Sequence, residues 1–392
     1  MDGDEARSEV LRLTRDLIAI ESHKEAPGRE AEIGRFLVEW FRDRGIDAER
    51  QPVDGERANV IARVPGGDGP ALLLNGHLDT VPAGDMPDAF SPRVEDGNLR
   101  GRGSCDMKGA IAAMACTLAE VKRARERSSA SLVGDLVFAG TVDEETGSLG
   151  VKRLVDEGVE ADYAVVGEPT SLRVALAHKG SCFVQVKLFG TGAHGSCPER
   201  GVNAASYAAR VVAAIEDELR PELAARTHPL LGRSTVSVGR ICGGTQPNIV
   251  AERCEIEIDR RYLPGEANPV PEILGIVARI CDGVGGLRYE VAEMPMTSRV
   301  SHVPLGALPG SVIARAALEA CRAAGRPDQP IGVTYWTDGG HLAASGIETI
   351  VLGPGDIAWA HGPEEHVVID QLVTAWDLYR AIALRVLSPV GG

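Results

Sequence analysis

The chain has 392 residues, enough for two or three domains with a sizeable buried core. Hydrophobic residues make up 44% and charged residues 25%, which is typical of folded globular proteins and excludes wholesale disorder or a fibrous architecture. The net charge is -15, and no basic stripe is present that would neutralise phosphates, so we expect no nucleic acid as a partner.

The sequence carries no signal for a membrane or for secretion. No apolar run approaches the roughly 18 residues that a membrane helix needs, and the acidic start, MDGDEARSEVLRLTRDL, is unlike a secretory signal. The eight cysteines are scattered without a CxxC pair, which disfavours a zinc ribbon or a disulfide framework. We therefore expect reduced thiols, a cytoplasmic location and no membrane partner.

Predicted helices and short buried strands alternate along the first 178 residues. Apolar residues at helical spacing predict helices over residues 5–20, 29–44, 107–125 and 149–157. Apolar runs bounded by glycine, proline or asparagine predict strands over residues 59–64, 71–74, 136–140, 163–166 and, far downstream, 349–353. This alternation predicts an α/β domain with a mostly parallel central sheet, formed by residues 1–178 and 297–392.

Residues 179–296 follow a different pattern. Apolar and polar residues alternate from Cys182 to Leu188 and from Cys254 to Ile258, as in strands with one packed and one wet face. Helices are predicted over residues 203–219 and 269–281. The order β, α, β, β, α, β predicts an inserted α+β domain of the split βαβ, ferredoxin-like kind. Its half-exposed sheet edge could pair with a second copy, so we expect a homodimer formed through this domain.

Polar residues stand where several of the predicted parallel strands end. The strand ALLL leads into NGHLDTVP, which puts His77 and Asp79 at the edge of the sheet where ligands bind in α/β proteins. An imidazole two residues before a carboxylate suits a metal ligand and the carboxylate that fixes the tautomer of a histidine. A pair of ordinary turn residues is the simpler interpretation of this motif taken alone.

The block GRGSCDMKG places Asp106 directly before a predicted helix. Asp is also a favoured N-cap, whose carboxylate accepts hydrogen bonds from free backbone N–H groups, so this residue alone does not indicate a site. The glycines do not form a phosphate-binding loop, because Lys108 precedes Gly109 instead of following it.

Three consecutive acids, Asp143, Glu144 and Glu145, follow the strand LVFAG. Adjacent carboxylates repel each other; water compensates for this on an exposed loop, whereas a divalent cation and a shared proton compensate for it at the end of a sheet. One acid of the pair can then bind metal while its neighbour acts as a general base.

Two further strand ends carry candidate ligands: Glu168 in the block GEPT, and His361 and His366 in AHGPEEH. Either histidine could instead be an ordinary surface residue. Two histidines and three carboxylates match a pair of metals about 3.5 to 4 Å apart, bridged by one carboxylate and a water. Zinc accepts this mixed set of nitrogen and oxygen ligands, and cobalt or manganese would also fit.

Together these blocks resemble the dinuclear zinc deacylases and exopeptidases, a family that includes acetylornithine deacetylase, succinyl-diaminopimelate desuccinylase, aminoacylase and glutamate carboxypeptidase. The resemblance covers nearly the whole chain, in the family's order and spacing. It rests on the blocks NGHLDTVP, GRGSCDMKG, TVDEETG, VVGEPT, GTGAHGSCPERGVNA, GGTQPNIV, IDRRYLPGE and AHGPEEH. It implies a zinc-exopeptidase-like catalytic domain with two metals, in which His77 and Glu168 hold one ion, Glu145 and His361 hold the other, and Asp106 bridges them.

The resemblance also implies roles outside the metal ligands. Asp79 would orient His77, and Glu144 would be the general base that takes a proton from the bridging water and passes it to the leaving amine. His194 would reach across a dimer interface to stabilise the oxyanion, which needs a preorganised donor. Asn248 and Arg261 would bind the substrate, with Arg261 gripping an α-carboxylate.

The neighbour of Arg261, Arg260, is expected to face water on the alternating strand. The chain departs from the family pattern at Cys105, Ala110 and Gly195. The segment around His194 also lacks the form usual in desuccinylases, which favours an acetylornithine-type deacylase.

The implied function is hydrolysis of the amide bond of an N-acyl amino acid, by attack of a metal-bridging hydroxide on the amide carbonyl. A metallocarboxypeptidase or dipeptidase acting on a short peptide and a succinyl-diaminopimelate desuccinylase are alternatives within the same chemistry. Outside enzymes, the alternative is an inactive metal-binding homologue. A phosphoesterase also uses paired metals, but no basic clamp for phosphate accompanies these motifs.

Overall fold

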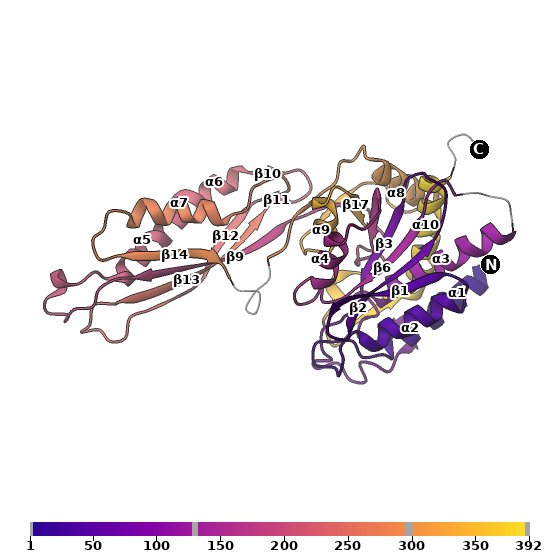
Figure 1. Cartoon of the computed structure of the whole chain (residues 1–392), viewed down its shortest axis with the longest axis horizontal. Helices are drawn as coiled ribbons and strands as arrows, with labels where there is room; N and C mark the ends of the chain where they lie inside the picture. Colours follow the sequence, from indigo (N-terminus) through magenta and orange to yellow (C-terminus); the bar gives the residue numbers. More distant parts are fainter. Residues whose placement is uncertain (1–2, 128–131, 295–300, 389–392) are drawn as a thin grey trace. The chain divides into compact units, whose positions relative to one another are not determined.

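The computed structural model of the chain describes residues 3–127, 132–294 and 301–388. The chain divides into two compact units (Figure 1). Unit 1 comprises residues 1–177, 305–333 and 337–392, and unit 2 comprises residues 178–304 and 334–336. Within the described residues, no helix is both long and apolar enough to cross a membrane. All eight cysteines are free thiols.

Unit 1 is built on a nine-stranded sheet in the order β1-β2-β6-β3-β7-β17-β8-β15, with β16 paired to β8. The four central strands β6, β3, β7 and β17 run parallel, and antiparallel pairs flank them. Their bounds are β1 (Asp47–Asp54), β2 (Arg57–Val64), β3 (Leu72–His77), β6 (Leu136–Thr141), β7 (Tyr163–Val166), β8 (Ala175–His178), β15 (Leu305–Gly306), β16 (Ile331–Val333) and β17 (Glu348–Val351). The predicted α/β fold with a mostly parallel central sheet is confirmed.

Helices cover both faces of this sheet, with α4 and α9 on one side and α3 and α10 on the other (Figure 1). The helices of unit 1 are α1 (Gly3–Ile18), α2 (Ala31–Arg42), α3 (Lys108–Arg127), α4 (Leu149–Asp156), α8 (Val312–Ala323), α9 (Gly339–Ala344) and α10 (Ile369–Leu387). Every residue of α3 from Lys108 to Ala119 is buried. A helix that is apolar on all sides belongs in a core, and α3 lies between the sheet and the helices α1 and α10.

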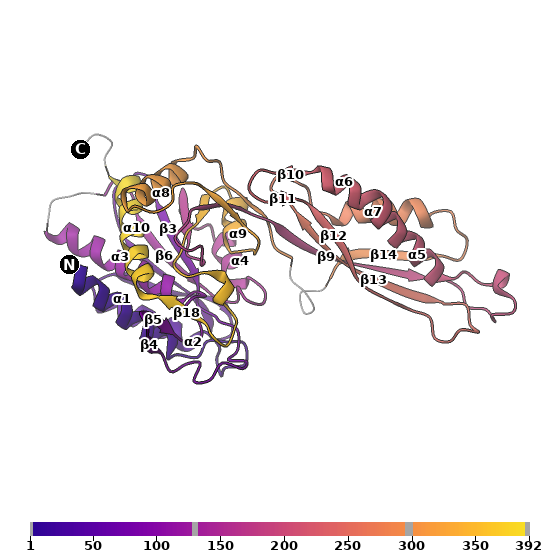
Figure 2. The ribbon, with the colours of Figure 1, turned by 180° about the vertical axis from the view of Figure 1, so that it is seen from behind.

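A small antiparallel sheet holds two loops of unit 1 together. Its strands are β4 (Arg93–Glu95), β5 (Asn98–Arg100) and β18 (His366–Val368), and Arg100 of β5 pairs with His366 of β18. Figure 2 shows β5 beside β18. Because β5 leads into the loop that ends at Asp106, and the segment after His361 leads into β18, this pairing brings the two loops together.

Unit 2 contains a four-stranded antiparallel sheet in the order β12-β13-β9-β14. Its main elements are β9 (Gly180–Phe189), α5 (Ala204–Ala214), a π-helix (Ile215–Leu219), α6 (Arg220–Ala225), β12 (Thr235–Gly243), β13 (Arg253–Tyr262), α7 (Val270–Cys281) and β14 (Arg288–Glu293). One face of the sheet packs with the helices into a core of apolar residues. The predicted split βαβ order is confirmed. Near the ends of unit 2, Ser181 and His302 form an antiparallel bridge, with both N–H to O distances at 2.9 Å.

The expectation that Arg260 faces water is wrong. Its side chain is 1% exposed and donates to Glu272 at 3.2 Å, whereas the side chain of Arg261 is 29% exposed. The reason is the strand's period of two: Ile256, Ile258 and Arg260 share the packed face of β13, and Arg261 points to the other face.

Candidate metal centre

Five candidate ligands converge at one edge of the sheet of unit 1. His77 is the last residue of β3, Glu145 follows β6 and Glu168 follows β7. Asp106 stands two residues before α3, and His361 lies in the segment between β17 and β18. Since the central strands are parallel, their carboxyl ends lie at the same edge, where ligands bind in α/β sheets.

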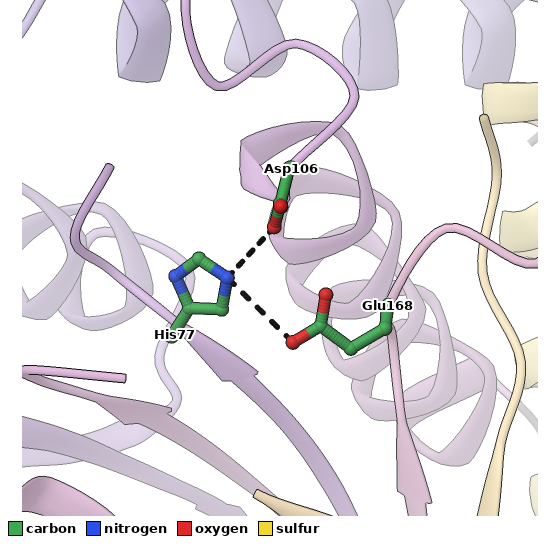
Figure 3. A group of neighbouring side chains, drawn as sticks. All are labelled: His77, Asp106 and Glu168. Atoms are coloured by element: carbon green, nitrogen blue, oxygen red, sulfur yellow. Dashed lines mark hydrogen bonds and ion pairs between the residues drawn. The ribbon is translucent and has the colours of Figure 1, made fainter. Parts of the chain in front are cut away.

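The ligand atoms form two groups that share Asp106. In the first group, Nε2 of His77 lies 2.8 Å from Oδ1 of Asp106 and 3.6 Å from Oε1 of Glu168 (Figure 3). In the second group, Nε2 of His361 lies 3.1 Å from both Oδ2 of Asp106 and Oε1 of Glu145. Within each group the ligand atoms lie within 4.8 Å of one another. One carboxylate therefore faces both groups, each with a different oxygen.

Burial raises the pKa values of the three glutamates of this centre, Glu144, Glu145 and Glu168, whereas hydrogen bonds with His361 and His77 lower the pKa of Asp106. Burial, and then the charges of neighbouring carboxylates, raise the pKa of Glu144 and of Glu168 well above the ordinary value. Hydrogen bonds with Asp106 and Glu145 raise the pKa of His361 to about 10. Each group offers one imidazole and two carboxylates, the mixed donor set that divalent transition metals accept. Two divalent cations would balance the buried negative charge, so the residues present fit a pair of metals.

Asp79 links the first group to the acidic turn, the segment after β6 that carries Asp143, Glu144 and Glu145. Nδ1 of His77 is 2.9 Å from the backbone oxygen of Asp79 and 3.6 Å from its carboxylate. A proton on Nδ1 donated to that carbonyl would leave Nε2 free to face the metal. The carboxylate of Asp79 accepts the N–H of Glu144 at 3.1 Å and the N–H of Glu145 at 3.0 Å. Asp79 therefore holds the backbone of this turn at both glutamates.

A buried charge cluster, which sequence reasoning missed, holds the acidic turn from its other side. Arg57 on β2 donates two hydrogen bonds to Glu30, each at 2.7 Å, and one to Asp143 at 2.6 Å. Asp143 has φ = 73°, a left-handed conformation that Asp tolerates better than most residues. Glu30 and Arg57 are far from the acids in sequence and belong to no motif, so no local signal could have identified them.

His366 stands outside both metal groups. Its Nδ1 contacts the backbone oxygen of Glu364 at 2.8 Å, and its ring lies 4.5 Å from that of Trp359, centroid to centroid. Of the two histidines in AHGPEEH, the structure therefore brings only His361 to the other ligands.

The remaining site candidates, His194, Asn248 and Arg261, belong to unit 2. His194 is exposed and forms an isolated bridge with Ile249, while the N–H of Gly195 donates to the backbone oxygen of Asn248 at 2.7 Å. The two sequence blocks that carry His194 and Asn248 are thus neighbours in space.

Arg261 lies elsewhere in unit 2, on β13. It pairs with Asp259 at 2.8 Å, and its guanidinium lies 5.5 Å from the ring centre of Phe183 and 5.4 Å from that of Trp336. A partly exposed guanidinium between two aromatic rings retains free donors for an anionic group.

Comparison with known proteins identifies the family. The sequence profile of peptidase family M20/M25/M40 matches residues 73–385. Acetylornithine deacetylase of Myxococcus xanthus is 34% identical over 359 residues, covering 86% of this chain and 88% of that protein. The crystal structure of an aminopeptidase from Bacillus cereus, 25% identical, superposes with a TM-score of 0.78 over 97% of this chain and 98% of that one. A dinuclear metal-binding M20 peptidase from Bacillus subtilis, 17% identical, has the same fold, with a TM-score of 0.71 over 98% and 99% of the two chains.

The profile match spans most of the chain, and the deacetylase exceeds 30% identity over most of its length. The paired ligand groups in unit 1 agree with this relationship, because they could hold the metal ions that a metal-dependent hydrolysis of an amide bond uses. The chain therefore belongs to peptidase family M20/M25/M40 and is a metal-dependent hydrolase of amide bonds.

Proposed function

We propose that this enzyme removes the acyl group from an N-acyl amino acid, in the manner of an acetylornithine deacetylase, and that its two metal ions are zinc. The observation that carries the proposal is the pair of ligand groups that share Asp106, with Glu144 beside them. The 34% identity to acetylornithine deacetylase supports an N-acyl amino acid as the substrate class. Cobalt or manganese would also suit the donor set.

In this proposal His77 and Glu168 would hold one ion, Glu145 and His361 would hold the other, and Asp106 would offer one carboxylate oxygen to each. The ions supply Lewis-acid chemistry, which activates water and polarises the amide carbonyl. The backbone oxygen and the carboxylate of Asp79 keep His77 and the acidic turn oriented.

Glu144 acts as the general base. It is 7% exposed and next to the proposed ligand Glu145. A carboxyl group whose pKa is raised by burial and by Glu168 is suited to take a proton from the attacking water. Glu144 then passes this proton to the amide nitrogen as the C–N bond breaks, so the products are a carboxylate and a free amine.

Residues of unit 2 complete the site in the proposed homodimer. The exposed imidazole of His194 donates to the developing oxyanion in the partner's site. Asn248 and Arg261 bind the substrate, and Arg261 holds its α-carboxylate. The dimer is supported by β12, which lies at the edge of its sheet, and by the exposed apolar residues Ile241 and Ile249 close to that edge, at 51% and 42% exposure.

We place this reaction in the cytoplasm, because a reducing compartment keeps eight unpaired thiols reduced. A second candidate is peptide hydrolysis, as a carboxypeptidase or dipeptidase. It is supported by the similarity in fold and sequence to an aminopeptidase. The same centre could hydrolyse a peptide bond, since both reactions attack a linear amide.

The test is a hydrolysis assay on N-acetyl, N-succinyl and N-formyl amino acids, including N-acetylornithine, and on dipeptides. The protein is loaded with zinc, cobalt or manganese, and a chelator-treated sample serves as the control. We expect release of a free amino acid from N-acetyl substrates, abolished by the chelator and restored by the metal. Faster hydrolysis of dipeptides than of any acyl amino acid would favour the second candidate, and activity that survives removal of the metals would refute the mechanism.

A further inference from the structure

Glu365 is a fully buried carboxylate beside the metal centre, with 0% exposure. Its Oε1 accepts three backbone N–H groups from one loop, those of Gly103 at 3.0 Å, Cys105 at 3.1 Å and Asp106 at 3.2 Å. Its Oε2 accepts a hydrogen bond from Arg102 at 2.5 Å. The loop that ends at the shared ligand Asp106 is therefore wrapped around this one carboxylate.

Arg102 extends the connection to two more loops. Its guanidinium, 2% exposed, donates to the backbone oxygens of Pro82 at 3.2 Å and Ala83 at 3.0 Å, in the segment that follows His77 and Asp79. It also donates to the backbone oxygens of Gly362 at 3.3 Å and His361 at 3.4 Å. One buried ion pair thus joins the loops that follow β3, precede α3 and precede β18.

We propose that Arg102 and Glu365 are positioning residues that set the distance between Asp106 and His361, and thereby the affinity of the second metal ion. This inference rests on the two-metal centre proposed above. His361 has φ = 64°, an uncommon left-handed conformation for a residue with a side chain, and Arg102 donates a hydrogen bond to its backbone oxygen. Glu365 holds the backbone of Asp106, the other ligand of the same pair.

The effect is selective for the second ion. His77 ends β3 and Glu168 follows β7 after one residue, so two of the three ligands of the first group stand at the ends of central strands, whereas two of the three ligands of the second group lie in loops. Asp106 and His361 lie in loops, and the Arg102–Glu365 pair connects those loops. Neutralising one member leaves the other charge buried without its partner, so the loops must rearrange.

The experiment compares Glu365→Gln with Glu364→Gln. Glu364 is the adjacent residue and pairs with Arg100 at the same distance of 2.5 Å, but its side chain is 64% exposed. Zn²⁺ binding is measured by calorimetry, Co²⁺ binding by its visible absorption, and folding by circular dichroism. We expect the wild type and Glu364→Gln to bind two ions, and Glu365→Gln to bind the first normally and the second about 10 to 100-fold more weakly.

A folded Glu365→Gln protein that binds both ions with wild-type affinity overturns the inference and leaves the two-metal centre intact. A wild-type protein that binds fewer than two ions refutes the two-metal centre itself. If Glu365→Gln does not fold, Arg102→Lys carries the test. Lysine keeps the positive charge opposite Glu365 but cannot make all the hydrogen bonds of Arg102 to backbone oxygens. Arg102→Lys must therefore also weaken the binding of the second ion and leave the binding of the first unchanged.

Discussion

Arg57 and Asp143 form a buried ion pair, Nη2 to Oδ1, at 2.6 Å, one residue before the general base Glu144 of the proposed mechanism. Asp143 thus takes no part in the ligand groups, although it belongs to the same run of three acids. Its charge is matched by a guanidinium that Glu30 also binds. The three acids divide into one structural carboxylate, one proposed base and one proposed ligand.

Replacement of Arg57 by methionine should destabilise the protein by about 3–5 kcal/mol, because it leaves Glu30 buried without its cation and leaves Asp143 with only the more exposed Arg29, 3.9 Å away. The matched control is Arg63→Met on the same strand, whose side chain is 37% exposed and pairs with Asp135. A surface pair of this kind contributes at most about 1 kcal/mol. Urea unfolding of both variants measures the difference, and equal losses would contradict the structural role of Arg57.

Glu144→Gln should lower kcat by about 10² to 10⁴-fold and leave both metal ions bound, because an amide cannot take up the proton. Glu145→Gln is the comparison, because Glu145 belongs to the second ligand group and its replacement should instead weaken the binding of the second metal ion. Steady-state kinetics and metal analysis of the two purified variants separate the roles. Loss of a metal from Glu144→Gln with kcat per loaded site unchanged would reverse the assignment.

The proposed contribution of His194 to the partner's site predicts complementation. His194→Ala and Glu144→Gln should each be nearly inactive as homodimers, but a mixed dimer contains one site with both residues intact. Random exchange of subunits should therefore restore activity to about one quarter of the wild-type value. Mixing His194→Ala with His194→Asn is the control and should restore none. Absence of recovery in the first mixture, with exchange verified, would show that His194 acts within its own chain or not at all.

Asp338 should make the metal-free protein less stable as the pH rises. Burial raises its pKa from 3.8 to about 6; Oδ2 accepts a hydrogen bond from Thr141 at 2.7 Å, and Oδ1 has no hydrogen-bond partner among the described residues. Between pH 4 and 6 the folded protein holds a proton that the unfolded chain has released, so stability falls as the pH increases.

Asp338→Asn removes this titration. The difference in free energy of unfolding, variant minus wild type, should therefore rise by about 1–2 kcal/mol as the pH increases from 5 to 8. Urea unfolding in the presence of a chelator measures this difference. Asp370→Asn, at a side chain that is 72% exposed, should show no such trend. A pH-independent difference for Asp338→Asn would mean that Asp338 titrates near its ordinary pKa.

The strands that carry the ligands were predictable because each is a short apolar run that ends in a polar block. β1 was not predictable, because its sequence DAERQPVD is polar and contains Pro52. β1 lies at the edge of the sheet, where proline and polar residues are tolerated. The polar character of Arg102 and Glu365 likewise hid their structural role in the sequence. Charged residues usually face water, and only the folded chain shows that these two are buried against each other.

Arg260 shows how one position changes an interpretation. On an alternating strand, adjacent arginines point to opposite faces, and the sequence DRRY does not say which of the two the core receives. The count along β13 from Ile256 and Ile258 would have placed Arg260 inside, where Glu272 neutralises it. Apolar residues two and four positions away on the same strand therefore predict the burial of a residue better than its own charge does.

The bridge between Ser181 and His302 has a consequence for folding kinetics. β8 and β15, which flank the insertion, are neighbours in the large sheet, so this sheet can be completed only when the two ends of unit 2 meet. Closing a long flexible loop carries an entropic cost that grows with its length. Once unit 2 has folded and paired its own ends, the segment between β8 and β15 acts as a short connection. Insertions in the distal loops of unit 2 should then leave the folding rate of unit 1 nearly unchanged.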